Sequence, residues 1–306
     1  MSNPIFVFST KRRMRSIRTP AVFTLYAAIL LALSLAQVLV TLGRGYMTVR
    51  DMRAGIEGYI WLTFLQFALI ILIAPAMTAG AISGERERQT LDLILVTNTG
   101  SLRIVLGKLL ESFLFLVVLI LSSAPFLSLV FLTGGIEPTE ILRTLLFLIV
   151  CAFAALSVGL FSSALFKRTA TAAVVAYLIV FAIGIGTLLP LFYGSNASIE
   201  RLSQDAALMQ SMSMDQALSL VPKLTLVNPA IGLVSLLVDQ TELIRQTFSN
   251  MVNYGYIYYS LFQEIQFDVI ANINMALMAG LGMLFALASA ALVRPRAFRL
   301  RRKGGR

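Results

Sequence analysis

Long apolar runs alternate with short polar segments along almost the whole chain. Six of these runs are close to the roughly 20 apolar residues that an α-helix needs to cross a bilayer. The pattern predicts an all-α polytopic membrane protein, with its transmembrane domain over residues 20–294. The expected spans cover about residues 21–42, 58–83, 109–133, 144–166, 170–193 and 269–293.

Composition and charge support this reading and orient it. Hydrophobic residues make up 58% of the chain and the mean hydropathy is +0.84, whereas soluble domains are about 45–50% apolar. If the N-terminus is inside, 18 of the 25 Lys and Arg residues lie in cytoplasmic segments, as the positive-inside rule requires. Both termini are therefore predicted to be cytoplasmic. No cleavable signal is expected, because the first apolar run is long and follows a basic segment.

The N-terminal segment, residues 1–19, is strongly basic. Its cations share one helical face and its apolar residues another, which predicts an amphipathic helix lying in the cytoplasmic interface. A plain positive-inside anchor is the alternative. The candidate residues of this helix are Lys11, Arg12, Arg15 and Arg18. The tail, residues 295–306, is also basic. Membrane lipids, and no nucleic acid, are the expected partners of such juxtamembrane charge.

Several chemistries lack the residues that they need. The chain has no histidine, and its one cysteine, Cys151, lies in an expected span. A zinc protease site and a Ser-His or Cys-His nucleophile pair are therefore excluded. Met209, Met212 and Met214 could bind Cu(I), a soft ion. Without Cys or His beside them, packing is the favoured role, so we predict no catalytic, cofactor-binding or metal-binding residue in this chain.

Residues 194–268 form the longest segment between two expected spans and predict an extracytoplasmic helical insertion. Within it, residues 224–238 are apolar but too short to span, and they contain Asn228-Pro229, so they are expected to be re-entrant or surface-lying. An aromatic cluster follows, for which an interfacial belt is favoured over a substrate-binding platform. The cluster consists of Tyr254, Tyr256, Tyr258, Tyr259 and Phe262.

A charged block separates the second and third expected spans and begins a cytoplasmic loop over residues 84–108. It reads Gly84-Glu85-Arg86-Glu87-Arg88-Gln89-Thr90-Leu91-Asp92. Apolar residues threaded between the charges predict a short amphipathic helix followed by a second passage into the membrane. A solvated loop with its opposite charges paired at the surface is the alternative.

This block, with Ile104-Val105-Leu106-Gly107-Lys108 after it, closely resembles the loop between the second and third spans in permease subunits of the ABC-2 transporter superfamily. Gln89 stands where many members have glycine. The opening Asn3-Pro4-Ile5-Phe6 resembles the subgroup of permeases of multicopper-enzyme maturation.

The resemblance implies that the loop is a coupling helix that docks on a separate ABC ATP-binding subunit. The residues implied at that interface are Glu85, Arg86, Glu87, Arg88, Thr90, Leu91 and Asp92. A second permease copy or paralogue, export, and a multi-pass location in a bacterial or archaeal cytoplasmic membrane are also implied. The chain has no G-x-x-x-x-G-K-[ST] phosphate-binding loop, so ATP and Mg are expected on the partner chain.

Two functions stay open on the sequence. The first is a permease subunit of an ATP-driven ABC exporter. The second is a non-transporting membrane anchor or sensor that relays an extracytoplasmic binding event through the same loop. An intramembrane enzyme is disfavoured by the absence of histidine. The expected spans contain no ring of charged residues that would identify a substrate. Their scarcity of ionisable residues favours a lipid-like, peptide or amphipathic cargo over a small hydrophilic ion.

Overall fold

The computed structural model describes residues 18–42, 49–91, 100–128, 136–187, 226–242, 244–245 and 267–293. Within these residues the regular secondary structure is helical throughout. The helices are α2 (Arg18–Leu42), α3 (Val49–Ala79), α4 (Ser83–Glu87), α6 (Ser101–Leu121), α7 (Ala124–Leu127), α8 (Pro138–Leu165), α9 (Thr169–Gly184), α13 (Pro229–Gln240) and α16 (Phe267–Leu292).

Four helical stretches, built on α3, α6, α8 and α16, are long and apolar enough to cross a membrane. Shorter apolar stretches of 10–17 residues lie in α2, α9 and α13. The prediction of an all-helical protein that crosses the membrane several times is thus confirmed. The number of six spans and the cytoplasmic side of both termini stay predictions.

Some predicted features fall on parts of the chain that the structure does not describe. The methionine and aromatic clusters of residues 194–268 and the basic tail lie outside the described residues. So do Lys11, Arg12 and Arg15 of the expected interfacial helix, whereas Arg18 is the first residue of α2.

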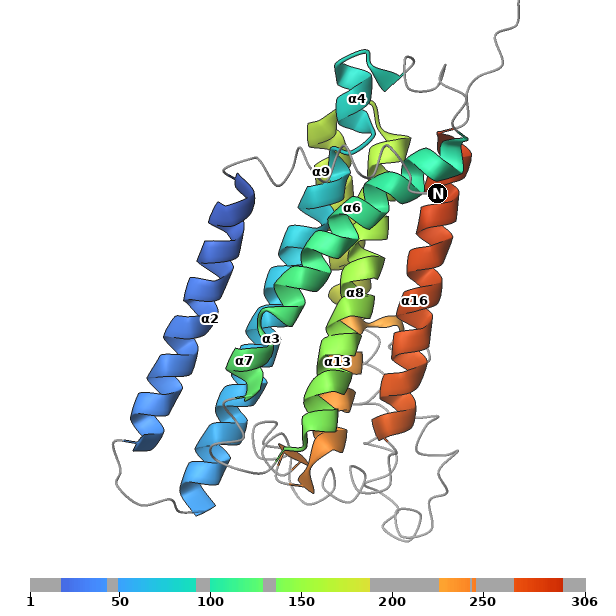
Figure 1. The fold of residues 1–306 in the computed structure, drawn as a ribbon. Helices are drawn as coiled ribbons and strands as arrows, with labels where there is room; N and C mark the ends of the chain where they lie inside the picture. Colours follow the sequence, from blue (N-terminus) through green and yellow to red (C-terminus); the bar gives the residue numbers. More distant parts are fainter. Residues whose placement is uncertain are drawn as a thin grey trace, which may run out of the picture.

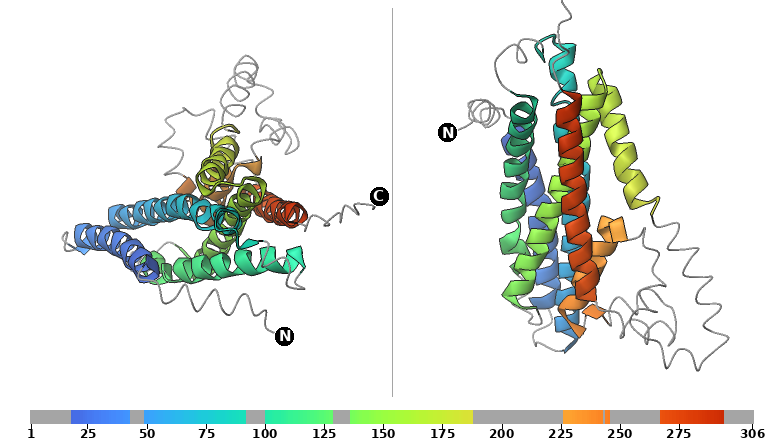
Figure 2. Two further views of the ribbon diagram at one scale, coloured as in Figure 1. Left: turned by 90° about the horizontal axis from the view of Figure 1, so that it is seen from above. Right: turned by 90° about the vertical axis from the view of Figure 1, so that its right-hand side faces the viewer.

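Helix α8 forms the centre of the bundle. Seen from the end, it is surrounded by α3, α6, α9 and α16, while α2 lies at the edge against α3 (Figures 1 and 2). Most of α8 is buried, and many of its buried residues are Ala, Ser or Gly. Small side chains let neighbouring backbones approach closely, which is how helices associate where lipid removes the hydrophobic driving force.

A close approach joins α3 to α8 where Pro75 interrupts the hydrogen bonding of α3. The Thr78 hydroxyl of α3 donates to the backbone carbonyl of Leu156 in α8 at 2.8 Å. Gly159 lies against this contact, and a Cβ added to it would stand 2.7 Å from the carbonyl oxygen of Pro75. Only glycine fits there, because the opposing atom belongs to the backbone.

The third apolar run is broken rather than continuous. α6 begins at Ser101, so residues 101–108, which the sequence pattern assigned to the loop, are helical. It ends at Leu121, and α7 starts at Ala124 with Pro125 in its first turn. Proline has no N–H and clashes with the carbonyl four residues earlier, which explains the break. The buried amide of Gln66 in α3 donates to the Ser123 hydroxyl at the break, at 2.6 Å.

Helix α13 packs against α16 and α8 at the opposite end from α4 (Figure 1). Asn228 caps it by accepting a hydrogen bond from the Ala230 N–H. The Asn228 amide also donates to the carbonyl of Gly184 at 2.6 Å and to the Thr187 hydroxyl at 2.9 Å, which ties α13 to the end of α9. The helix is thus packed against the bundle, and its re-entrant or surface-lying position relative to the membrane stays a prediction.

An ion pair closes the same end of the bundle. Arg143 of α8 donates to the Asp239 carboxylate of α13 at 2.9 Å and to the side-chain amide oxygen of Asn272 in α16 at 3.3 Å. Nearby, the Gln240 amide donates to the Thr144 hydroxyl, which also bonds Tyr59 of α3, each at 2.8 Å. These polar contacts hold α3, α8, α13 and α16 in register.

The Gly159 contact gives a test of the packing. We expect Gly159→Ala to destabilise the protein by roughly 1–3 kcal/mol, because the added methyl group overpacks α8 against the backbone at Pro75. Thermal unfolding of the purified protein in detergent measures the change. Gly280→Ala in α16 is the control, since a Cβ at Gly280 meets no atom within 4 Å. Equal melting temperatures for the two variants would contradict the packing argument.

Candidate functional site

The charged block forms a short, tightly folded projection after α3. A turn at residues 80–82 follows α3, and α4 then runs to Glu87. Gln89 has a φ of 57°, in the left-handed region that favours glycine. The chain turns back there, and the Thr90 N–H donates to the Glu85 carbonyl at 3.0 Å. The left-handed turn gives a physical reason for the glycine that many resembling permeases carry at this position.

Ser163 of α8 connects this projection to the bundle. Its hydroxyl accepts hydrogen bonds from the N–H groups of Ile82 and Ser83, both at 2.9 Å. In an unbroken helix those N–H groups would bond the carbonyls of Thr78 and Ala79. All of these groups are buried, so the Ser163 oxygen satisfies two donors that the turn would otherwise leave unpaired.

Glu85 joins α4 to α6. Its carboxylate accepts from the Lys108 ammonium at 3.0 Å and from the Thr90 hydroxyl. Burial alone would raise the pKa of Glu85, but the hydrogen bonds from Thr90 and Lys108, with the Lys108 charge, hold that pKa below its ordinary value. Glu85 is therefore ionised at neutral pH, where it forms the ion pair with Lys108.

Glu87 joins α4 to α9. Its carboxylate accepts from the backbone N–H of Thr169 at 2.9 Å and from the Thr169 hydroxyl at 3.0 Å. Thr169 is the first residue of α9, where N–H groups lack partners within the helix and a negative charge is favoured by the helix dipole. The Glu87 side chain is exposed, yet its oxygens are used inside the chain.

Arg86 completes the connection by donating to the carbonyl of Phe166, the residue after α8, at 3.3 Å. The loop that follows α3 and the turn between α8 and α9 therefore form one unit at one end of the molecule (Figures 1 and 2). Arg88 and Gln89 are exposed at this end, and so are Lys167 and Arg168 of the turn.

The structure brings together most of the residues singled out from the sequence. Glu85, Arg86, Glu87 and Thr90 all take part in the contacts above, and Leu91 is buried in the core. Asp92 lies outside the described residues. The sequence reasoning missed Ser163 and Thr169, because each lies about 80 residues from its partner and no local pattern marks such a contact.

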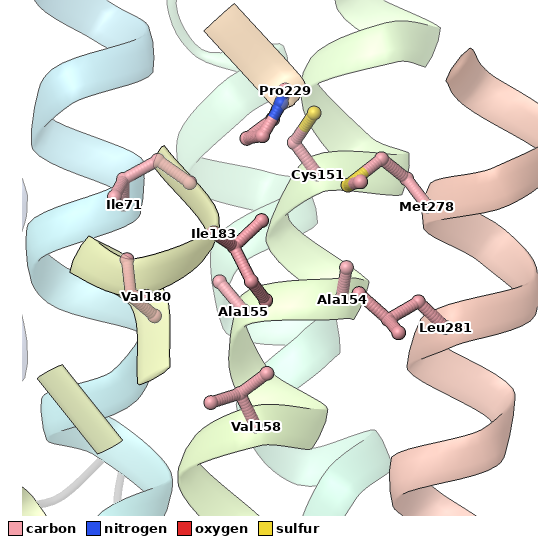
Figure 3. Close-up of a pocket in the computed structure, with 10 residues that line it drawn as sticks. All are labelled: Ile71, Cys151, Ala154, Ala155, Val158, Val180, Ile183, Pro229, Met278 and Leu281. Carbon is pink, nitrogen blue, oxygen red and sulfur yellow. The ribbon is translucent and has the colours of Figure 1, made fainter. Parts of the chain in front are cut away.

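The described residues offer no metal site, since no group of three His, Cys, Asp or Glu side chains is close enough to hold an ion. One apolar hollow of about 30 Å³ lies between α3, α8, α9, α13 and α16 (Figure 3). It is lined by Ile71, Cys151, Ala154, Ala155, Val158, Val180, Ile183, Pro229, Met278 and Leu281. Cys151 contributes a buried thiol, and no charged group reaches the hollow.

Fold and loop together define a helical membrane protein with a rigid projection at one end. Residues 51–292 match the family model described as ABC-2 family transporter protein. The match covers most of the chain, so the protein belongs to the ABC-2 transporter family and is one of its membrane components, a permease. A comparison with curated proteins finds no match. The narrower resemblance to permeases of multicopper-enzyme maturation stays a prediction.

The two hydrogen bonds at Ser163 can be tested directly. We expect Ser163→Ala to destabilise the protein by roughly 2–4 kcal/mol, because it leaves the buried N–H groups of Ile82 and Ser83 without an acceptor. Thermal unfolding in detergent again measures the change. Ser162→Ala is the matched control, since Ser162 is also buried but bonds only the Val158 carbonyl of its own helix. If Ser163→Ala melts like Ser162→Ala, Ser163 does not hold the projection.

Proposed function

We propose that this chain is the permease subunit of an ATP-driven exporter and that it pairs with a second permease copy or paralogue. The observation that carries the proposal is the family match over a region that includes the loop. In this proposal, separate ATP-binding subunits hold ATP and Mg, since the chain has no phosphate-binding loop of its own. We place the protein in a bacterial or archaeal cytoplasmic membrane.

The proposed coupling element is the projection around α4, residues 83–91. An ATP-binding subunit would push on it, and three contacts would pass the displacement into the bundle. The displacement would reach α6 through the ion pair of Glu85 with Lys108. It would reach α8 through the hydrogen bond from the Ile82 N–H to the Ser163 hydroxyl. Thr169 would receive it for α9 through Glu87. Each contact joins the loop to a different helix, which supports the proposal that the loop and these three helices move together.

This arrangement changes the roles proposed for the acidic residues. Glu85 and Glu87 use their oxygens within the chain, so we assign them to force transmission inside the permease. We assign direct contact with the ATP-binding subunit to the exposed tip at Arg88 and Gln89. The alternative of a non-transporting anchor or sensor has no observation in its favour beyond those that the permease already explains.

The orientation of the loop can be tested with single cysteines. Cys151 is 1% exposed and should not react, so a new cysteine reports its own position. We expect a membrane-impermeant maleimide to label Thr139→Cys in intact spheroplasts, because Thr139 is exposed at the end that we place outside. Gln89→Cys should be labelled only in inverted vesicles. The reverse pattern would overturn the orientation.

Contact with an ATP-binding subunit is the test of the function itself. We expect Gln89→Cys, carrying a benzophenone photo-crosslinker, to form a crosslink with the ATP-binding subunit that co-purifies with the permease. Thr139→Cys with the same reagent should form none, since it lies at the other end of the bundle. A co-purifying subunit that crosslinks equally at both positions, or at neither, would contradict the coupling assignment.

A further inference from the structure

The end of the molecule that carries α4 exposes positive charge from two separate parts of the sequence. Arg88 ends the loop helix, and Lys167 and Arg168 form the turn between α8 and α9. All three side chains are exposed. We call these three residues the basic face.

The neighbouring carboxylates do not cancel this charge at the surface. Glu85 is paired with Lys108, and Glu87 directs its oxygens to the N-terminus of α9 at Thr169. Lys108 balances the charge of Glu85, whereas Glu87 keeps its charge and is stabilised by N–H donors and the helix dipole. Against these two carboxylates, the described part of the loop and the turn carries Arg86, Arg88, Lys167 and Arg168 besides Lys108. The net charge offered to a partner at this end is positive.

The two parts of the basic face are held in fixed relation. The Arg86 guanidinium bonds the carbonyl of Phe166, directly before Lys167, and Glu87 bonds Thr169, directly after Arg168. Each cation of the turn is therefore flanked by a residue tied to α4. A rigid pattern of charges gives electrostatic complementarity with one partner surface, whereas mobile side chains on separate loops would not.

We infer that the loop and the α8–α9 turn form a single basic docking surface, and that the ATP-binding subunit meets it with an acidic groove. This inference rests on the proposed function and adds to it the second loop and the charge of the partner. The turn at Lys167 and Arg168 was not among the interface residues implied by the sequence, because it lies about 80 residues from the loop.

A soluble protein suits this face better than lipid headgroups do. α4 and the α8–α9 turn lie at the extreme end of the molecule, beyond the end of α2 (Figures 1 and 2). Headgroup-binding cations are expected beside the membrane helices, at the level of the interface. The elements that carry the basic face instead lie at the end of the bundle, where a partner subunit would stand in the proposed function.

The test reverses charge in the turn alone and leaves the sequence of the loop unchanged. The full-length permease in nanodiscs of neutral phosphatidylcholine is titrated with the ATP-binding subunit, and the Kd is measured at low and at physiological salt. We expect Lys167→Glu with Arg168→Glu to weaken binding about tenfold or more at low salt, where charges are least screened. The salt dependence of the wild-type Kd should largely disappear in this double variant.

The double variant should fold, because Arg168 caps α9 without a side-chain hydrogen bond and an acidic residue is favourable at a helix N-terminus. An unchanged melting temperature confirms this. The matched control is Lys167→Arg with Arg168→Lys, which keeps both charges and should keep the wild-type Kd. If this control loses binding as strongly as the charge reversal, shape and not charge matters, and the inference fails.

The outcomes separate this inference from the proposed function. If the charge reversal leaves the Kd unchanged while Gln89→Cys still crosslinks, the turn is not part of the docking surface, although the coupling role of the loop stands. If Gln89→Cys forms no crosslink and the wild type does not bind the ATP-binding subunit, the proposed function itself fails. A different result would be that nanodiscs of phosphatidylglycerol raise the melting temperature of the wild type, and that the charge reversal removes this rise but leaves the Kd unchanged. The basic face would then bind anionic lipid, and the inference would be wrong.

Discussion

The two hydrogen bonds that Ser163 accepts hold together the parts of the molecule on which its proposed action depends. A membrane-embedded chain cannot leave backbone N–H groups unpaired, and the turn after α3 frees two of them at Ile82 and Ser83. A single hydroxyl on the central helix receives both. This lets the chain leave the regular helix of α3 while staying fixed to α8, so the charged projection is attached to the core and does not hang from a flexible linker.

The same constraint recurs wherever a helix of this bundle is interrupted. Where α6 ends, the Ser123 hydroxyl donates to the backbone carbonyl of Ile120. Where α13 begins, Asn228 bonds the Gly184 carbonyl and the Thr187 hydroxyl at the end of α9. Several buried polar side chains of this protein thus lie at helix ends, whereas others, such as Ser162 and Ser289, bond a carbonyl of their own helix. The role of those at helix ends is to allow irregular backbone inside an apolar bundle.

The all-helical membrane fold could be predicted from the sequence, because apolar run length reports directly on the cost of exposing polar backbone to lipid. The charged loop was found in the same way, as a block that no bilayer would accept. The break at Ser122 and Ser123 was not predicted, although Pro125 marked it, because the apolar run continues past it. The partners of Glu85 and Glu87 within the chain were also not predicted, since a charged residue in a loop gives no indication of whether its partner lies in its own chain or in another.

By itself, the sequence determined that the chain is a helical membrane protein of the ABC-2 type with a charged loop after its second apolar run, because hydropathy and a local motif are readable residue by residue. Tertiary structure alone decided where those charges go. It placed Thr169 against Glu87 and Phe166 against Arg86, each across about 80 residues. Only the packing of α3, α8 and α9 brings such groups together, and that packing depends on contacts between residues far apart in the chain.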